Sequence, residues 1–264
     1  MKRWLASVMT LLVLGTASGT AAAHFQLIYT PLVNLPRAAS IPLRLIFWHP
    51  LENSEVMAMP AIREFYYLHR GKRTPLEGAV AESTFQGRLG SARAYAGEVR
   101  LNRTGDYQFV LIPEPYFEAS EDAWIQQFTK AYVNRSGIPD SWDQPAGLVT
   151  EIVPLVRPTN VIAGSSFTGR VLSGGKPVPG ASIEVEYISA DIDAANHRVA
   201  SDRSVTPVGG AIEIRSDANG YFTYAIPKAG FWGFAALGVG PETEWQGKPL
   251  SQDAVIWVRA FDLP

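Results

Sequence analysis

Short apolar segments separated by turn-forming residues are the feature that most limits what this chain can fold into. Glycine (23 residues) and proline (19 residues) are spread along all 264 positions. No periodic apolar face is long enough to predict a long helix. Between the turns, branched and aromatic residues gather in short runs typical of strands, at 25–29, 41–48, 64–69, 105–112 and 128–133. The pattern therefore predicts an all-β fold of the sandwich class.

The strand pattern is interrupted near Pro154 and Pro158, which predicts a domain boundary. Proline cannot donate a hydrogen bond to a sheet and stiffens a linker. A second set of short strands follows, with a strong hairpin turn at 217–220 (Asp-Ala-Asn-Gly) because Asn and Gly tolerate positive φ. We expect two consecutive immunoglobulin-like β-sandwich domains, at 24–156 and 157–264, the second of the carboxypeptidase-regulatory or transthyretin-like kind.

One short helix is expected at 119–127. This segment opens with Ser120, Glu121 and Asp122, which resemble a helix cap followed by acidic residues in the first turn.

The first 23 residues have the three-part plan of a secretory signal peptide. Lys2 and Arg3 precede an apolar run at 5–14, and three alanines end at Ala23. That run is too short to span a bilayer as an anchor, so we expect cleavage after Ala23, periplasmic localisation and no membrane insertion of the mature chain. Removing 1–23 leaves 21 Lys and Arg against 25 Asp and Glu, a net charge of −4. Neither that charge nor any basic patch predicts a nucleic-acid partner.

The chain contains no cysteine, which excludes disulfides, thiolate catalysis and thiolate metal ligands. A metal site must therefore use nitrogen, oxygen or thioether ligands. Glycine-rich phosphate loops, nucleophile elbows and zinc-protease motifs are also missing from the sequence, so no catalytic residues are expected.

His24 becomes the first residue of the chain if cleavage follows Ala23. A free α-amine and the imidazole of the same residue can then chelate one metal ion. Their unperturbed pKa values, about 7.7–8.0 and about 6.5, make both nitrogens available near neutral pH. The alternative is a chance histidine that frays in solvent, but the strand that follows directly should hold the terminus.

Three further side chains join His24 as candidate metal ligands. His49 ends a strand just before a proline, although a histidine in such a place is more often a packed or surface residue. Two histidine clamps would suit the tetragonal geometry of Cu(II) or Ni(II). Met57 and Met59 have the spacing of one strand face, and thioethers favour Cu(I), while core packing is the competing role for at least one of them.

Several segments together resemble one bacterial family. They are Ala-His-Phe at 23–25, Phe-x-His-Pro at 47–50, Met-x-Met at 57–59, Pro-Glu-Pro-Tyr-Phe-Glu at 113–118 with Glu-Asp at 121–122, and the segments 151–158, 175–186, 217–222, 229–237 and 255–259. As a set they resemble the nickel uptake transporter family proteins, also described as the periplasmic component of a cobalt or nickel transport system. The resemblance spans nearly all of the mature chain.

The resemblance implies that the protein delivers nickel or cobalt to a membrane-embedded metal transporter, with His24 and His49 as metal ligands. One position departs from the family pattern: Gln127 stands where the family carries a histidine. If that histidine is a ligand, this site has one nitrogen fewer.

Two other function classes remain open on the sequence. One is a copper protein, either a carrier or an oxidative enzyme, built on an N-terminal histidine brace with an axial tyrosine or phenylalanine. The other is a metal-free adhesion or sugar-binding sandwich, for which the seven tryptophans are the argument.

Overall fold

Three β-sheets make up the protein, whose computed structural model describes residues 24–208 and 210–263. The signal peptide expected at 1–23 lies outside the described residues. A seven-stranded sheet, here the first sheet, contains β1 (Phe25–Tyr29), β3 (Ala39–Trp48), β4 (Val56–Met57), β7 (Val80–Gln86), β8 (Ser91–Leu101), β17 (Ile192–Asp193) and β18 (Arg198–Val199).

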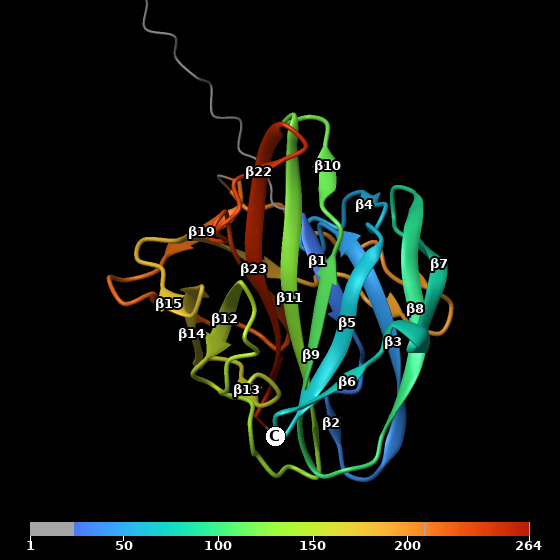
Figure 1. The fold of residues 1–264 in the computed structure, drawn as a ribbon. Coiled ribbons are helices and arrows are strands. Elements are labelled where there is room, and N and C mark those ends of the chain that lie inside the picture. Colours follow the sequence, from blue (N-terminus) through green and yellow to red (C-terminus); the bar gives the residue numbers. More distant parts are fainter. Residues whose placement is uncertain (1–23, 209, 264) are drawn as a thin grey trace, which may run out of the picture.

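A twelve-stranded sheet, the central sheet, forms the middle of the molecule (Figure 1). It contains β2 (Asn34–Leu35), β5 (Ile62–His69), β6 (Lys72–Pro75), β9 (Gly105–Pro113), β10 (Tyr116–Glu118), β11 (Ala123–Arg135), β13 (Val161–Ile162), β16 (Ser182–Tyr187), β19 (Ile212–Arg215), β21 (Gly230–Ala236), β22 (Glu244–Trp245) and β23 (Lys248–Phe261). The small sheet has four strands, β12 (Thr150–Pro154), β14 (Ser166–Ser173), β15 (Lys176–Pro177) and β20 (Tyr221–Ala225).

The prediction of an all-β fold with packed sheets is confirmed. The one helical element among the described residues is a single 3-10 turn, η1 (Glu77–Ala79). In that part of the chain, no helix has the length and apolarity needed to cross a membrane.

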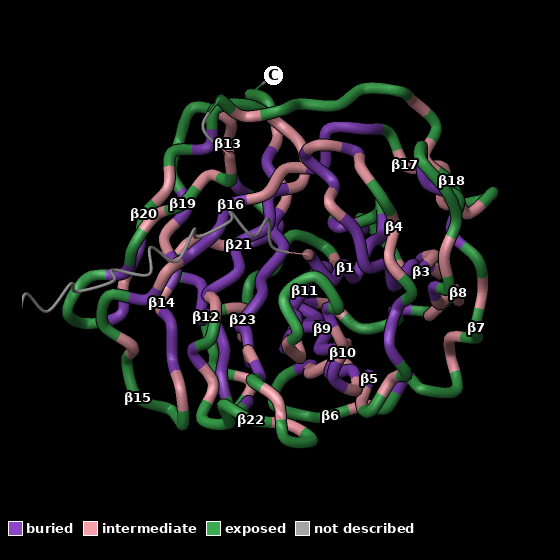
Figure 2. Tube along the Cα trace, turned by 90° about the horizontal axis from the view of Figure 1, so that it is seen from above, coloured by how far each residue is buried: buried purple, intermediate pink, exposed green. Residues whose placement is uncertain are grey.

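The two largest hydrophobic cores lie on opposite faces of the central sheet. The larger core packs β1, β3 and β8 against the central sheet, and includes Phe25, Leu43, Phe65 and Phe109. The other lies between β16, β21 and β23 and the small sheet, and includes Phe167. Figure 2 shows the buried residues gathered in the interior and the exposed ones mainly in the outer loops and edge strands.

Strand β23 contributes to both cores. Val255 and Trp257 belong to the larger core, whereas Ala254, Ile256 and Val258 belong to the other. Successive side chains of a strand point to opposite faces, so an unbroken apolar run suits a strand covered on both sides. β23 also pairs in parallel with β11, and this pairing joins strands from both expected domains in one sheet. The two expected domains thus share backbone hydrogen bonds, and each of the two cores contains residues from both of them.

The short helix expected at 119–127 is wrong. Residues 119–122 form a turn, and β11 begins at Ala123 and pairs with both β10 and β23. Ser120 donates from its N–H and its hydroxyl to Oε1 of Glu118, at 2.9 and 2.5 Å, and Asp122 adopts a left-handed φ of 52°. Short polar side chains favour such turns over helices, and the strand gains two pairing partners.

A candidate metal centre where strands β1 and β3 meet

His24 and His49 lie side by side because of the β1–β3 register. The two strands are antiparallel, and Phe25 of β1 is opposite Trp48 of β3. His24 precedes Phe25 and His49 follows Trp48, so the next opposite pair is the two histidines. Directly opposite residues of antiparallel strands have side chains close enough to touch. The imidazole centroids are 4.4 Å apart, at an angle of 50°.

Glu118, at the end of β10, completes the cluster. Its Oε2 lies 3.1 Å from Nε2 of His24, and its other oxygen accepts both hydrogen bonds from Ser120. The side chain is buried, so its position is fixed by these contacts. Nε2 of His24 is therefore occupied by a carboxylate, which leaves Nδ1 as the ring nitrogen available to a further partner.

Burial and charge set the protonation of this cluster. Burial lowers the pKa of His24 below its ordinary value of 6.5, and the negative charge of Glu118 opposes part of that shift. Burial raises the pKa of Glu118, but the Ser120 hydrogen bonds and the charges of His24 and His49 outweigh it, so the net shift is downward. At neutral pH the cluster thus holds an ionised carboxylate beside an uncharged imidazole of His24.

Gln127 fixes the backbone around His24 from the neighbouring strand β11. Its Nε2 donates to the carbonyl oxygen of His24 at 2.6 Å, and its Oε1 accepts from the N–H of Gln26 at 2.7 Å. The same Nε2 lies 3.3 Å from Oδ2 of Asp253, a buried carboxyl whose pKa is raised by burial. Gln127 therefore holds the backbone on both sides of Phe25 in place.

Two aromatic rings line the cluster. The ring of Phe47 lies 5.4 Å and that of Tyr116 6.1 Å from the His24 imidazole, centroid to centroid. These two rings also contact each other edge to face at 5.1 Å. They give the histidine pair an apolar wall, which limits water on that side.

The two methionines lie close by in the first sheet and the larger core. Met59 is fully buried, and its sulfur accepts a weak hydrogen bond from Nε2 of Gln26 at 3.9 Å. Met57 is half-buried on β4, opposite Phe47. The recorded contact of the Met59 thioether is thus with Gln26 rather than with either imidazole.

The other two histidines have separate partners. Nδ1 of His69 lies 3.0 Å from the carbonyl oxygen of Asp106, and Nδ1 of His197 lies 2.6 Å from the hydroxyl of Ser83.

Within residues 24–208 and 210–263, no three His, Asp or Glu side chains are arranged as a complete metal site. This centre offers two imidazoles and the carboxylate of Glu118, which contacts one of them. The sequence patterns indicate the two histidines, but they do not place Glu118 or Gln127 in the candidate site. The sequence signal for Glu118 is its two-residue spacing from Tyr116, which in an extended segment puts both side chains on one face.

These observations define an all-β protein with a paired-histidine centre at the edge of its larger core. The chain belongs to the family described as "Domain of unknown function (DUF4198)", which matches residues 21–240. A comparison with curated proteins finds no match.

Among solved structures, the chain is similar to the D0-D1 domain of intimin, with 11% identity over 88% of this chain and 96% of that chain and a TM-score of 0.22. It is also similar to the adhesin InvE of Yersinia pseudotuberculosis, with 13% identity over 88% and 58% of the two chains and a TM-score of 0.24. The fibronectin(III)-like modules of Clostridium thermocellum CbhA match at 9% identity over 89% and 95%, with a TM-score of 0.19.

Proposed function

We propose that the mature protein, beginning at His24, is a periplasmic carrier that binds a nickel or cobalt ion and passes it to a membrane-embedded transporter. The observation that carries this proposal is the contact between the two imidazoles, 4.4 Å apart, with Glu118 on Nε2 of His24. The metal ion is the cargo of the protein in this proposal.

The donor set fits a late divalent transition metal. The α-amine and Nδ1 of His24 would form one chelate, and a nitrogen of His49 would add a third donor. A carboxylate on the far nitrogen of a metal-binding imidazole orients the ring and makes it a better ligand, and Glu118 has that place. Nitrogen donors in a tetragonal arrangement suit Ni(II) and Cu(II), and Co(II) comes directly before Ni(II) in the general order of divalent-metal affinity.

A three-donor site also suits a carrier. It leaves coordination positions open, so a transporter can supply its own ligands before the carrier releases the ion. The side chain of His24 is 15% exposed, so the centre is within reach of such a partner.

The decisive experiment compares two versions of the protein that differ by one residue. One begins at His24, and the other carries a single extra glycine before it, which turns the α-amine into an amide nitrogen with no available lone pair. We expect nickel and cobalt affinity, measured by isothermal titration calorimetry, to fall at least about 100-fold in the extended protein. Thermal stability without metal should be the same in both.

His49→Ala, in the protein that begins at His24, should lower nickel affinity by about 10- to 100-fold or more while the fold is kept. Equal nickel affinity in the mature and extended proteins would mean that the N-terminal chelate does not exist. The metal-free adhesion or sugar-binding function would then be the favoured alternative.

A copper protein is the second candidate, favoured by the aromatic rings of Phe47 and Tyr116 beside His24. A histidine brace with an axial aromatic residue is the arrangement that such proteins need. Loading the mature protein with copper and measuring oxygen-dependent consumption of ascorbate separates the two. Turnover above that of free copper would favour an oxidative enzyme, whereas inert, tightly held copper would favour a carrier.

A further inference from the structure

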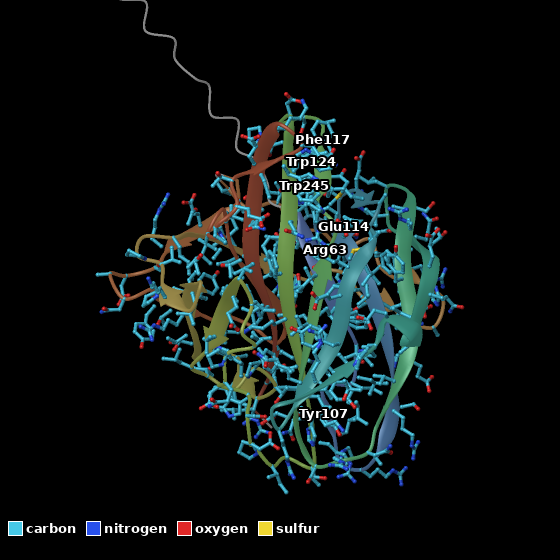
Figure 3. The ribbon with its side chains drawn as sticks, viewed as in Figure 1. Arg63, Tyr107, Glu114, Phe117, Trp124 and Trp245 are labelled. Atoms are coloured by element: carbon cyan, nitrogen blue, oxygen red, sulfur yellow. The ribbon has the colours of Figure 1, made fainter. Side chains whose placement is uncertain are left out.

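A basic pocket of about 300 Å³ lies between the β5–β6 turn and the β8–β9 loop. Its walls include four cationic residues, Arg70, Lys72, Arg100 and Arg103. Figure 3 shows Tyr107, which lines this pocket, at the opposite end of the molecule from Phe117, which follows Tyr116 of the metal centre. The pocket is therefore separate from the centre described above.

The charges in this pocket are mostly uncompensated. No aspartate or glutamate is among its lining residues. Arg70 is neutralised by Asp140, whose Oδ2 lies 2.9 Å from Nε, and Arg100 donates to the uncharged amide oxygen of Asn102 at 3.0 Å. Within the described part of the chain, no ion pair is recorded for Lys72 or Arg103. The pocket thus has an excess of positive charge in a protein whose net charge is negative.

His69 is a second feature of the pocket wall. Its ring stacks on Tyr107 at 4.4 Å and 17°, and Nδ1 lies at hydrogen-bond distance from the Asp106 carbonyl oxygen. The residue is 7% exposed, and its Nε2 has no hydrogen-bond partner among the described residues. A buried nitrogen without a partner costs free energy. Because Nδ1 donates to that carbonyl oxygen, Nε2 of the uncharged ring is an acceptor, and a P–OH group of a protonated phosphate in this pocket would supply its partner.

We propose that this pocket binds a compact oxyanion, either phosphate or a small phosphate monoester. Arginine and lysine form short, charge-assisted hydrogen bonds with phosphate oxygens. The volume suits one phosphate group with a small substituent and is at the lower end of ligand pockets. The rings of Tyr67 and Tyr107, in edge contact at 5.1 Å, give an apolar surface for that substituent.

The test uses the mature protein and two probes, inorganic phosphate and glycerol phosphate, in isothermal titration calorimetry. The double variant Lys72→Gln and Arg103→Gln should weaken binding of the tighter probe at least about tenfold, since each lost charged hydrogen bond is a large fraction of the affinity. The matched control is Arg37→Gln with Lys176→Gln. It removes one arginine and one lysine, both exposed and both outside the pocket. Its affinity should stay within about twofold of the parent.

A third variant, His69→Asn, keeps a side-chain N–H near the position of Nδ1 and removes Nε2. It should also weaken phosphate binding, with the circular dichroism spectrum unchanged. Tighter binding of glycerol phosphate than of inorganic phosphate would identify a monoester as the ligand, and the reverse would identify the free anion. Equal loss in the control double variant, or no saturable binding below about 10 mM, would overturn the proposal. Nickel affinity should be the same in all these variants, so this test is independent of the proposed metal function.

Discussion

At the scale of single residues, the candidate centre depends on side chains that act through His24. Glu118 occupies one nitrogen of the imidazole, and Gln127 accepts from and donates to the backbone on either side of Phe25. Neither residue needs to touch a metal ion to matter. The proposed metal function needs His24 to be held in one position, and these two residues restrict its motion.

Glu118→Gln tests the role of that carboxylate. The negative charge of Glu118 raises the pKa of His24, so its removal should lower that pKa further below 6.5. Nickel affinity at neutral pH should fall by about 10- to 100-fold, because the ring loses the carboxylate charge that makes it a better ligand. NMR titration of the His24 ring protons and calorimetry with nickel measure the two effects. An unchanged pKa together with unchanged affinity would show that the carboxylate is incidental.

At the scale of elements, the loop that follows His49 is tied to the second half of the chain. The N–H of Leu51 donates to Oε2 of Glu186 at 2.9 Å, and the hydroxyl of Ser189 donates to the carbonyl oxygen of Pro50 at 2.9 Å. Nδ2 of Asn53 donates to the carbonyl oxygens of two further residues, at 3.2 and 2.9 Å. The loop next to the candidate ligand is therefore ordered by strand β16 and the segment after it.

Glu186 gives this contact a pH dependence. Burial raises its pKa to about 8, against an ordinary value of 4.5. Between these two values the folded protein keeps a proton that the unfolded chain has lost. The free energy of unfolding should therefore fall as the pH rises from 4.5 to 8, by up to about 1.4 kcal/mol per pH unit from this group.

Glu186→Gln should remove that part of the slope and make the protein more stable than the parent at pH 8. Urea unfolding at pH 5.5, 6.5 and 7.5 measures the slope of the free energy of unfolding with pH. The control is Glu213→Gln, which replaces an exposed glutamate on β19. A slope that is the same in Glu186→Gln and in the parent would contradict the prediction.

At the scale of the whole molecule, the two parts are joined by a strand that both cores need. Trp257 of β23 packs edge to face against Phe25 at 5.8 Å, and its Nε1 donates to the carbonyl oxygen of Gln26 at 2.8 Å. Its cross-strand partner on β21 is Gly233, where an added Cβ would lie 2.8 Å from the indole ring. A glycine is required there because the ring covers its backbone.

Trp257→Ala should lower the free energy of unfolding by about 3–5 kcal/mol, because a buried indole and its hydrogen bond are both lost. Since β23 belongs to both cores, both halves should become less stable together. Hydrogen exchange followed by mass spectrometry in increasing urea should show peptides from 24–156 and from 157–263 losing protection at one shared, lower midpoint. The half-buried Trp245, replaced in the same way, serves as the control. Separate midpoints for the two halves would mean that they unfold independently.

The sequence by itself determined the β-class of the fold, because short apolar runs between glycine and proline turns cannot build long helices. It also indicated the histidine pair, since a strand start at Phe25 and a strand end at Trp48 leave a histidine at each end.

Only the tertiary structure decided which strands pair and which side chains meet across the sheets. The segment 119–127 has helix-like capping residues, but it forms a turn at 119–122 and is extended from Ala123 on, because the neighbouring strand β10 and the distant strand β23 both pair with it. The same holds for Glu118, Gln127 and Trp257, whose roles come from contacts across sheets. Local patterns report which face of a strand is apolar, but not which strand will lie beside it, and that pairing is what places a carboxylate against an imidazole.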